Sequence, residues 1–241
     1  LDEPWRSRVD EEVTHSGSLF PGQTEGYRFM SGRIKREMLD YPEGEMSPGD
    51  VPHVMGRLGV DKAILFPNKL LSFSRLRSDD DRMVAVANAY VDYMLEEVVD
   101  PSEGIYTHVV APYNDPQAAA ELVDRVGDED GVVGVCLVTS GPEPPLGNRR
   151  YDPIYEAAED NGLPIVLHGG NLATSHAFPT QRQWNETYTG NHVITHPFGH
   201  IWHATTMLVR GVPARFPDLD FVFQEAGVEV RSSPMFRREV L

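Results

Sequence analysis

Two side chains capable of metal binding or acid–base chemistry stand where apolar, strand-like segments end. His168 follows the run 163–167 and precedes two glycines, and Glu225 follows the run 221–224. An imidazole nitrogen can bind a divalent metal, and a carboxylate can bind the same ion or act as a general acid or base. Position alone leaves a structural alternative for each: a loop-capping residue for His168, and a salt-bridging carboxylate beneath the rim for Glu225.

A third group of candidates lies between these two: His192, His196, His200 and His203. Their spacing would place the last three on one face of a helix, but Pro197 and a glycine interrupt the segment. We expect residues 169–199 to form a lid-like loop over the active site, because loops of this length are usually functional or disordered. In that case His196 and His200 contact the substrate. The alternative is a set of polar residues on a loop and a helix start.

The elements that must position these residues alternate along the chain. Apolar runs predict strands, and capped segments with helical spacing predict helices. The predicted strands are 61–67, 104–111, 132–138, 163–168 and 219–224, and the predicted helices are 78–99, 115–126, 152–161 and 200–215. Residues 1–55 are rich in turn residues and are expected to be irregular.

Strands that are apolar throughout and alternate with helices indicate a parallel sheet buried on both faces. A (β/α) barrel and an open doubly wound sheet both satisfy this α/β pattern. No glycine-rich phosphate-binding motif follows any of the strands, which disfavours nucleotide binding. In a barrel the chemistry sits at the carboxyl ends of the strands, where both His168 and Glu225 fall.

Composition narrows the classes of partner. The net charge of -16 argues against nucleic acid and anionic membranes, since both require basic patches. Only three of the 21 basic residues are lysines, which with the many acidic residues suggests a salt-adapted, halophilic protein. The one cysteine, Cys136, lies in an apolar run and is expected to be buried and structural. Without a signal-peptide pattern at the first residues, we expect a cytoplasmic protein.

Two segments make the chain similar to a known family. Residues 151–168, which read YDPIYEAAEDNGLPIVLH, and residues 211–227, which read GVPARFPDLDFVFQEAG, resemble the amidohydrolase-2 family of metal-dependent hydrolases. Its members include aminocarboxymuconate-semialdehyde decarboxylase and other decarboxylases. Residues 1–6 resemble the segment just after the family's first strand. The resemblance implies a single TIM-type (β/α) barrel domain over residues 1–241, with the first and last strands missing.

The resemblance also implies a divalent metal, usually zinc. The family's ligands are a His-x-His on the first strand, a His on the fifth and an Asp on the last. His168 matches the fifth-strand ligand. The position of a further active-site His on the sixth strand is occupied by Glu225, which leaves it as ligand, acid/base or structural carboxylate. The matches imply that the His-x-His and the Asp lie outside these 241 residues.

The leading hypothesis is a metal-dependent hydrolase or a non-oxidative decarboxylase acting on a small organic acid or its derivative. The rival is a catalytically inactive barrel fragment that binds a ligand or a partner chain without turnover. A third interpretation is an α/β binding protein without metal. A homo-oligomer could complete the open sheet edges that an incomplete barrel leaves.

Overall fold

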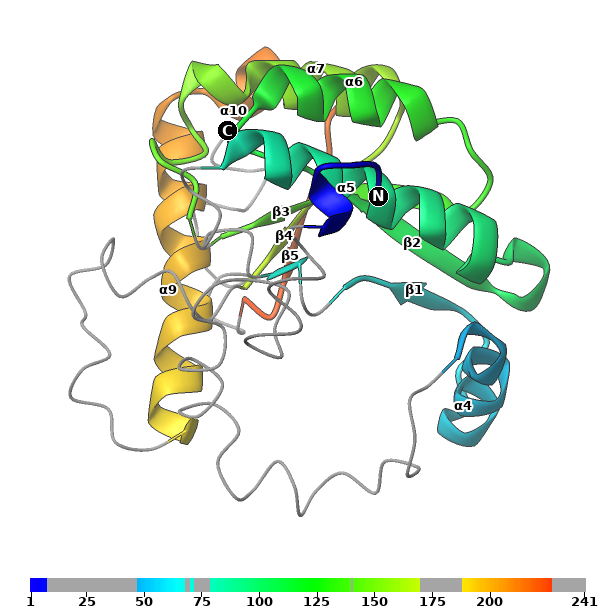
Figure 1. Cartoon of the computed structure of the whole chain (residues 1–241). Helices are drawn as coiled ribbons and strands as arrows, with labels where there is room; N and C mark the ends of the chain where they lie inside the picture. Colours follow the sequence, from blue (N-terminus) through cyan, green and yellow to red (C-terminus); the bar gives the residue numbers. More distant parts are fainter. Residues whose placement is uncertain (8–46, 68–69, 72–78, 140, 170–187, 227–241) are drawn as a thin grey trace.

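Five parallel strands form the centre of the molecule. A computed structural model describes residues 1–7, 47–67, 70–71, 79–139, 141–169 and 188–226, with the backbone alone for 188–196. The strands pair in chain order, β1-β2-β3-β4-β5, and every pairing is parallel. Figure 1 shows the strands with a helix after each of the inner ones.

The elements follow the predicted order closely. The strands are β1 (Ala63–Leu65), β2 (Ile105–Val110), β3 (Val132–Val138), β4 (Ile165–His168) and β5 (Phe221–Gln224). The helices are α4 (Val51–Leu58), α5 (Asp80–Tyr93), α6 (Pro116–Val126), α7 (Asp152–Asp160), α9 (Tyr188–Val209) and α10 (Val212–Arg215). Shorter pieces are the 3-10 turns η1 (Pro48–Asp50), η4 (Pro101–Glu103) and η5 (Arg149–Tyr151), and the π-helical η3 (Met94–Val98), which continues α5.

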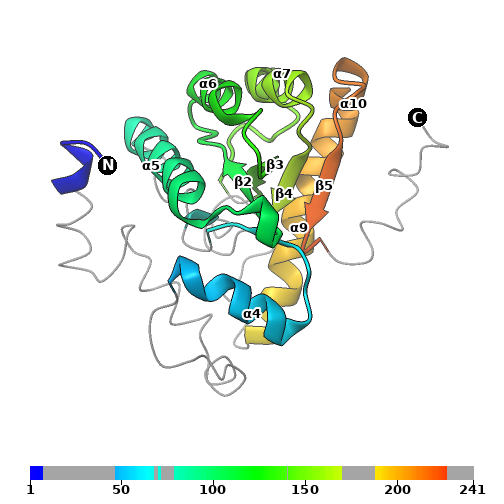
Figure 2. The same ribbon diagram turned by 90° about the vertical axis from the view of Figure 1, so that its right-hand side faces the viewer.

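Helices cover one face of the sheet. Figure 2 shows α5, α6 and α7 side by side over the strands, with α9 and α10 continuing this layer beside β5. Two of these helices begin with an aspartate cap: the Asp79 side chain accepts from the Arg82 amide, and that of Asp115 from the Ala118 amide. The main core lies between this helical layer and the strands.

Ring contacts and register show which strand residues face the helices. Phe221 of β5 makes an edge contact with Tyr155 of α7, with ring centroids 6.0 Å apart. Phe221 pairs with Ile165, and His168 pairs with Gln224. Because side chains alternate along a strand, His168 and Gln224 face away from the helices. We call this side of the sheet the inner face.

The sheet is a curled part of a barrel, as predicted. A TIM barrel closes on itself with eight parallel strands, whereas β1 and β5 are open edges among the described strands. The inner-face residues of these two edges are correspondingly uncovered: Ile64 is 47% exposed and Val222 is 43% exposed. The alternative of an open doubly wound sheet has helices on both faces, whereas the described helices that pack on β2 to β5 lie on one face (Figures 1 and 2).

Three predicted boundaries were wrong. The predicted lid-like loop 169–199 does not reach residue 199, because α9 already begins at Tyr188 and continues through Pro197; residues 170–187 lie outside the described residues. The predicted helix 200–215 is two helices, separated at Gly211 with φ 68°. The irregular segment predicted for 1–55 does not reach residue 55, since η1 begins at Pro48 and α4 at Val51.

Candidate functional site

His168 ends β4 with its side chain on the inner face. It is 4% exposed, and the ring of Phe66, which follows β1, lies 4.6 Å from the imidazole between centroids. Its Nδ1 lies 2.7 Å from the backbone oxygen of Gly169. Since a carbonyl only accepts, Nδ1 must carry the proton, and in the neutral ring Nε2 then presents its lone pair. Metal-binding histidines are commonly held in this way.

The Glu225 side chain reaches the inner face near His168 because the backbone turns at this residue. Gln224 pairs with His168 and faces inward, so a continuing strand would point Glu225 toward the helices. Instead Glu225 has φ 60°, and it is the one described residue other than glycine with a positive φ. Non-glycine residues in this left-handed region are strained and concentrate at functional sites. The turn brings the carboxylate back toward His168.

The two side chains form a pair suited to a cation. Glu225 Oε2 lies 3.8 Å from His168 Nε2, and the carboxylate side chain is 47% exposed whereas the imidazole side chain is 5% exposed. Two ligands of one tetrahedral zinc lie about 3.4 Å apart, from metal–ligand distances near 2.1 Å. Nitrogen and carboxylate donors are what zinc and manganese accept. The pair therefore fits two positions of a divalent metal site, or an ion pair if His168 is protonated.

The described residues do not supply a complete metal site. Among them there is no group of three or more His, Cys, Asp or Glu side chains placed to hold one ion. The structure therefore brings together His168 and Glu225 and adds no third protein ligand from the parts of the chain that it describes.

Of the predicted histidines of the 192–203 group, the structure describes the side chains of His200 and His203, and neither lies beside His168 and Glu225. His200 is fully buried on α9, with its ring 5.9 Å from that of Phe223, which faces the helices as Phe221 does. This position is across the sheet from His168, so the geometry gives no support to the substrate contact predicted for His200. His196 is in α9, and its side chain lies outside the described residues.

His203 has a structural role. Its Nδ1 accepts from the Leu146 amide at 3.2 Å, and its Nε2 lies 2.9 Å from the Thr139 carbonyl oxygen. Burial lowers the pKa of His203 to about 4, against a smaller raising effect of the Thr139 bond. The neutral ring thus ties α9 to the loop that follows β3.

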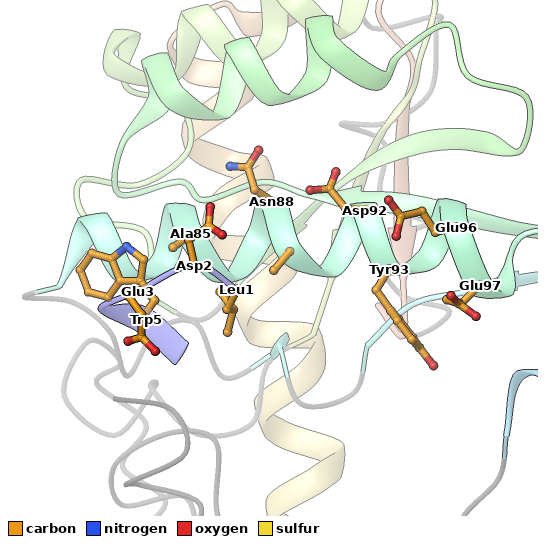
Figure 3. Close-up of a pocket in the computed structure, with 11 residues that line it drawn as sticks. Leu1, Asp2, Glu3, Trp5, Ala85, Asn88, Asp92, Tyr93, Glu96 and Glu97 are labelled. Carbon is orange, nitrogen blue, oxygen red and sulfur yellow. The ribbon is translucent and has the colours of Figure 1, made fainter. Parts of the chain in front are cut away.

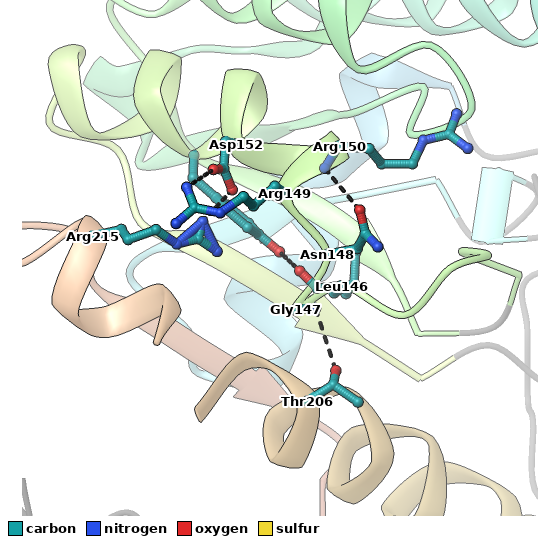
Figure 4. A network of polar contacts seen from close by, with 9 residues as sticks. Leu146, Gly147, Asn148, Arg149, Arg150, Asp152, Thr206 and Arg215 are labelled. Atoms are coloured by element: carbon teal, nitrogen blue, oxygen red, sulfur yellow. Dashed lines mark hydrogen bonds and ion pairs between the residues drawn. The ribbon is translucent and has the colours of Figure 1, made fainter. Parts of the chain in front are cut away.

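That loop, between β3 and α7, is held at several further points, shown in Figure 4. The Tyr155 hydroxyl donates to the Leu146 carbonyl at 2.8 Å, and the Gly147 amide donates to Thr206 Oγ1 at 3.3 Å. The Arg215 guanidinium donates to the Asp152 carboxylate, joining α10 to α7. These contacts hold in place the loop that follows β3, the strand next to His168.

His108 is an inner-face residue that sequence reasoning missed. Its neighbour Thr107 hydrogen-bonds with Tyr90 of α5, so His108 on β2 faces the other way. The side chain is 2% exposed, and burial, followed by the charge of nearby His168, lowers the pKa of His108 to about 4. The signal in the sequence was a histidine within the apolar strand IYTHVV.

Cys136 is fully buried, and burial raises the pKa of its thiol to about 12, which confirms the expected structural role. No helix in the described parts of the chain has the length and apolar character needed to cross a membrane.

A separate pocket of about 730 Å³ lies on the outer side of α5, against the N-terminal residues (Figure 3). Five of its eleven lining residues are acidic: Asp2, Glu3, Asp92, Glu96 and Glu97. Because α5 separates it from the strands, this pocket is not part of the site around His168.

Comparison with known proteins agrees with this architecture. A family model described as amidohydrolase matches residues 53–239. No curated protein sequence matches the chain significantly.

Similar solved structures include three enzymes or enzyme homologues. A 5-carboxyvanillate decarboxylase from Sphingomonas paucimobilis is 19% identical with TM-score 0.60, covering 80% of this chain and 54% of its own. An amidohydrolase from Mycobacterium avium subsp. paratuberculosis K-10 is 22% identical with TM-score 0.63, and the match covers 76% of this chain and 49% of that protein. A dihydroxybenzoic acid decarboxylase from Polaromonas sp. JS666 holds manganese and the inhibitor 2-nitroresorcinol. It is 18% identical with TM-score 0.58, and the match covers 89% of this chain and 61% of that protein. These identities show the fold alone, and the chain spans about half to three fifths of each length.

Proposed function

Because this chain belongs to the amidohydrolase family, we propose that it functions as a metal-dependent hydrolase or non-oxidative decarboxylase acting on a small organic acid or its derivative. The observation that supports this proposal best is the pairing of His168 Nε2 with Glu225 Oε2 at 3.8 Å. Both atoms come from strand ends on the inner face, where barrels of this class place their chemistry.

We propose that His168 and Glu225 hold a divalent ion. When bound, such an ion supplies Lewis-acid chemistry, polarising a carbonyl or carboxylate oxygen or lowering the pKa of a water. His168 contributes Nε2, and the Gly169 carbonyl holds its ring in the required tautomer. Glu225 is about half exposed, so its carboxylate can also accept or return a proton at the site.

The substrate class is drawn from the similar structures. Two of the named neighbours are decarboxylases of aromatic hydroxy or carboxy acids, and one holds manganese. We propose an aromatic acid as the substrate, and zinc as the ion, with manganese as the alternative that elemental analysis distinguishes. His196 keeps its predicted substrate contact as a proposal.

Metal content tests the site directly. The wild-type protein, His168→Ala and His53→Ala are dialysed against zinc or manganese and analysed by elemental mass spectrometry. His53 is an exposed histidine on α4 and is the matched control for loss of one imidazole. We expect bound metal in the wild type and in His53→Ala, and a strong loss in His168→Ala. Equal content in all three proteins would remove His168 from the metal site.

Turnover separates the proposal from its rival. Carbon dioxide release from 2,6-dihydroxybenzoate and 5-carboxyvanillate is measured with the metal-loaded protein. Release that disappears in His168→Ala supports a decarboxylase. Metal binding without turnover of these or hydrolysable derivatives supports the inactive binding fragment.

We further propose a cytoplasmic homo-oligomer. The open edges of β1 and β5 present unpaired backbone groups that a second copy could cover. Analytical ultracentrifugation gives the test, and a monomer at all concentrations contradicts this assembly.

A further inference from the structure

His108 lies on the inner face below His168, two side-chain layers down in the strand register. It is in the middle of β2, and Cys136 links the two strands by pairing with Val110 on one side and Val166 on the other. The Cδ2 edge of the His108 ring is directed at Gly134 and Val166, since a Cβ built on Gly134 would meet atoms of both. The opposite edge of the ring, which includes Nδ1, therefore points away from β3 and β4.

The neighbouring strand is shaped to admit this ring. Between the pairs Thr107–Val132 and Val109–Val135 the register shifts, so that Val133 and Gly134 together oppose His108 alone. Such a bulge re-aims side chains and is frequent beside active sites. A Cβ at position 134 would come within 3.1 Å of His108 Cδ2 and 3.0 Å of Val166 Cγ2, closer than most packed Cβ atoms come to a neighbour. The glycine and the bulge together make room for an imidazole.

The ring is buried without using its full hydrogen-bonding capacity. His108 Nδ1 is inaccessible to solvent and has no hydrogen-bond partner among the residues that the structure describes. Leaving a buried polar atom unpaired is unfavourable, and leucine would fill the same space without this penalty. His203 provides the contrast, because it is equally buried and both of its ring nitrogens are bonded. The fold thus supplies partners to both ring nitrogens of His203, whereas the described residues supply none to Nδ1 of His108.

We infer that His108 is a ligand-binding residue whose imidazole hydrogen-bonds an oxygen atom of the bound organic acid, from beneath the His168–Glu225 pair. The identity of the ligand as an acid rests on the function proposed above. His108 is not placed as a third metal ligand, because the described residues contain no group of three donors around one ion. Its role is to orient the ligand, and the metal is held without it.

Nuclear magnetic resonance of protein labelled with ¹⁵N-histidine tests this contact. The probe is 2-nitroresorcinol, whose nitro and hydroxyl oxygens resemble those of a hydroxybenzoic acid and which cannot lose carbon dioxide. We expect the probe to shift the ring nitrogen signals of His108, assigned by their loss in His108→Asn, and to leave those of His203 in place. Acetate, as a simple carboxylate, is the second probe.

Variants separate ligand binding from folding. We expect His108→Leu to bind 2-nitroresorcinol at least about tenfold more weakly, the size of one lost hydrogen bond to a charged or polar group. Its bound metal and melting temperature should be maintained or increased, because leucine fills the same space and removes the buried, unpaired Nδ1. His108→Asn, which keeps an amide near the position of Nδ1, should bind with intermediate affinity, and His53→Ala like the wild type.

Two results overturn the inference. One is an unchanged dissociation constant in His108→Leu. The other is that neither probe shifts the ring nitrogen signals of His108. This second result would also be obtained if an ordered water were the sole partner of the ring. Neither depends on the metal content of His168→Ala, so a failure of the proposed metal site and a failure of His108 are distinguished.

Discussion

His168 Nε2 faces Glu225 Oε2 across 3.8 Å, and each atom is aimed by a backbone feature of its own strand end. For His168 this is the Gly169 carbonyl 2.7 Å from Nδ1, and for Glu225 it is a φ of 60°. The pair is thus preorganised before any ion binds, which is the arrangement that a metal site requires.

Glu225→Gln should weaken metal binding, because a neutral amide oxygen is a poorer ligand than a carboxylate. The expected loss of affinity is at least about tenfold, the scale found even for residues that only support a ligand. Isothermal titration with zinc measures it. The matched control is Glu156→Gln, an exposed glutamate on α7, which should titrate like the wild type; equal affinity in Glu225→Gln would show that Glu225 is not a ligand.

Gly134→Ala should destabilise the fold by about 1–3 kcal/mol, the usual effect of overpacking. The added methyl would lie 3.0–3.2 Å from Val166, His108 and the Pro164 carbonyl oxygen, and the last of these is backbone that cannot easily move. Urea unfolding gives the free energy. Gly56→Ala on α4 meets nothing within 4 Å and should be neutral or stabilising. Equal stability of both variants would contradict the close contact.

Acid should destabilise the protein through His203. Its pKa is about 4 in the folded state, against 6.5 for an unperturbed histidine. Between these values the unfolded state binds the proton and the folded state does not, so stability is full above pH 6.5 and falls as the pH drops toward 4. From pH 7 to pH 5 the loss for this one group is about 2 kcal/mol.

Urea unfolding at both pH values of the wild type and His203→Gln measures this effect. The variant should be less stable at pH 7 and should lose less stability on acidification. His108 has a lowered pKa for the same reason of burial, so both proteins retain its contribution and the difference between them isolates His203. Parallel pH profiles would refute the assignment.

Arg215→Met should cost about 1–2 kcal/mol, between the values for exposed and for buried ion pairs. The guanidinium joins α10 to Asp152 of α7, and the two side chains are only 16% and 23% exposed. Arg149 approaches the same carboxylate at 3.5 Å but is 78% exposed. Arg149→Met is therefore the control and should change stability by less than about 0.5 kcal/mol. A larger effect of Arg149→Met than of Arg215→Met would reverse this assignment.

Salt should stabilise the protein if it is salt-adapted. A net charge of -16 produces self-repulsion that ions screen. Calorimetry in increasing potassium chloride should show a rising melting temperature, with about 2–4 °C for each kcal/mol gained. A melting temperature independent of salt up to molar concentration would refute halophilic adaptation.

The amino-acid sequence by itself determined the strands, the order of elements, and the positions of His168 and Glu225 at strand ends. These follow from local properties: apolar runs such as 132–138 cannot remain in water, and aspartate caps such as Asp115 mark where helices begin. Hydrophobic patterning and capping act within a few residues, so they can be recognised in the sequence without knowledge of the tertiary structure.

Only the tertiary structure decided which face each side chain occupies. His108 faces inward because of its register with β3 and the bulge at Gly134, and no local pattern encodes pairing between residues that are distant in sequence. The extent of α9 was decided in the same way: Pro197 interrupts the local pattern, yet the helix continues, anchored by His203 and Thr206 to the loop after β3. Long-range contacts of this kind outweigh weak local propensities.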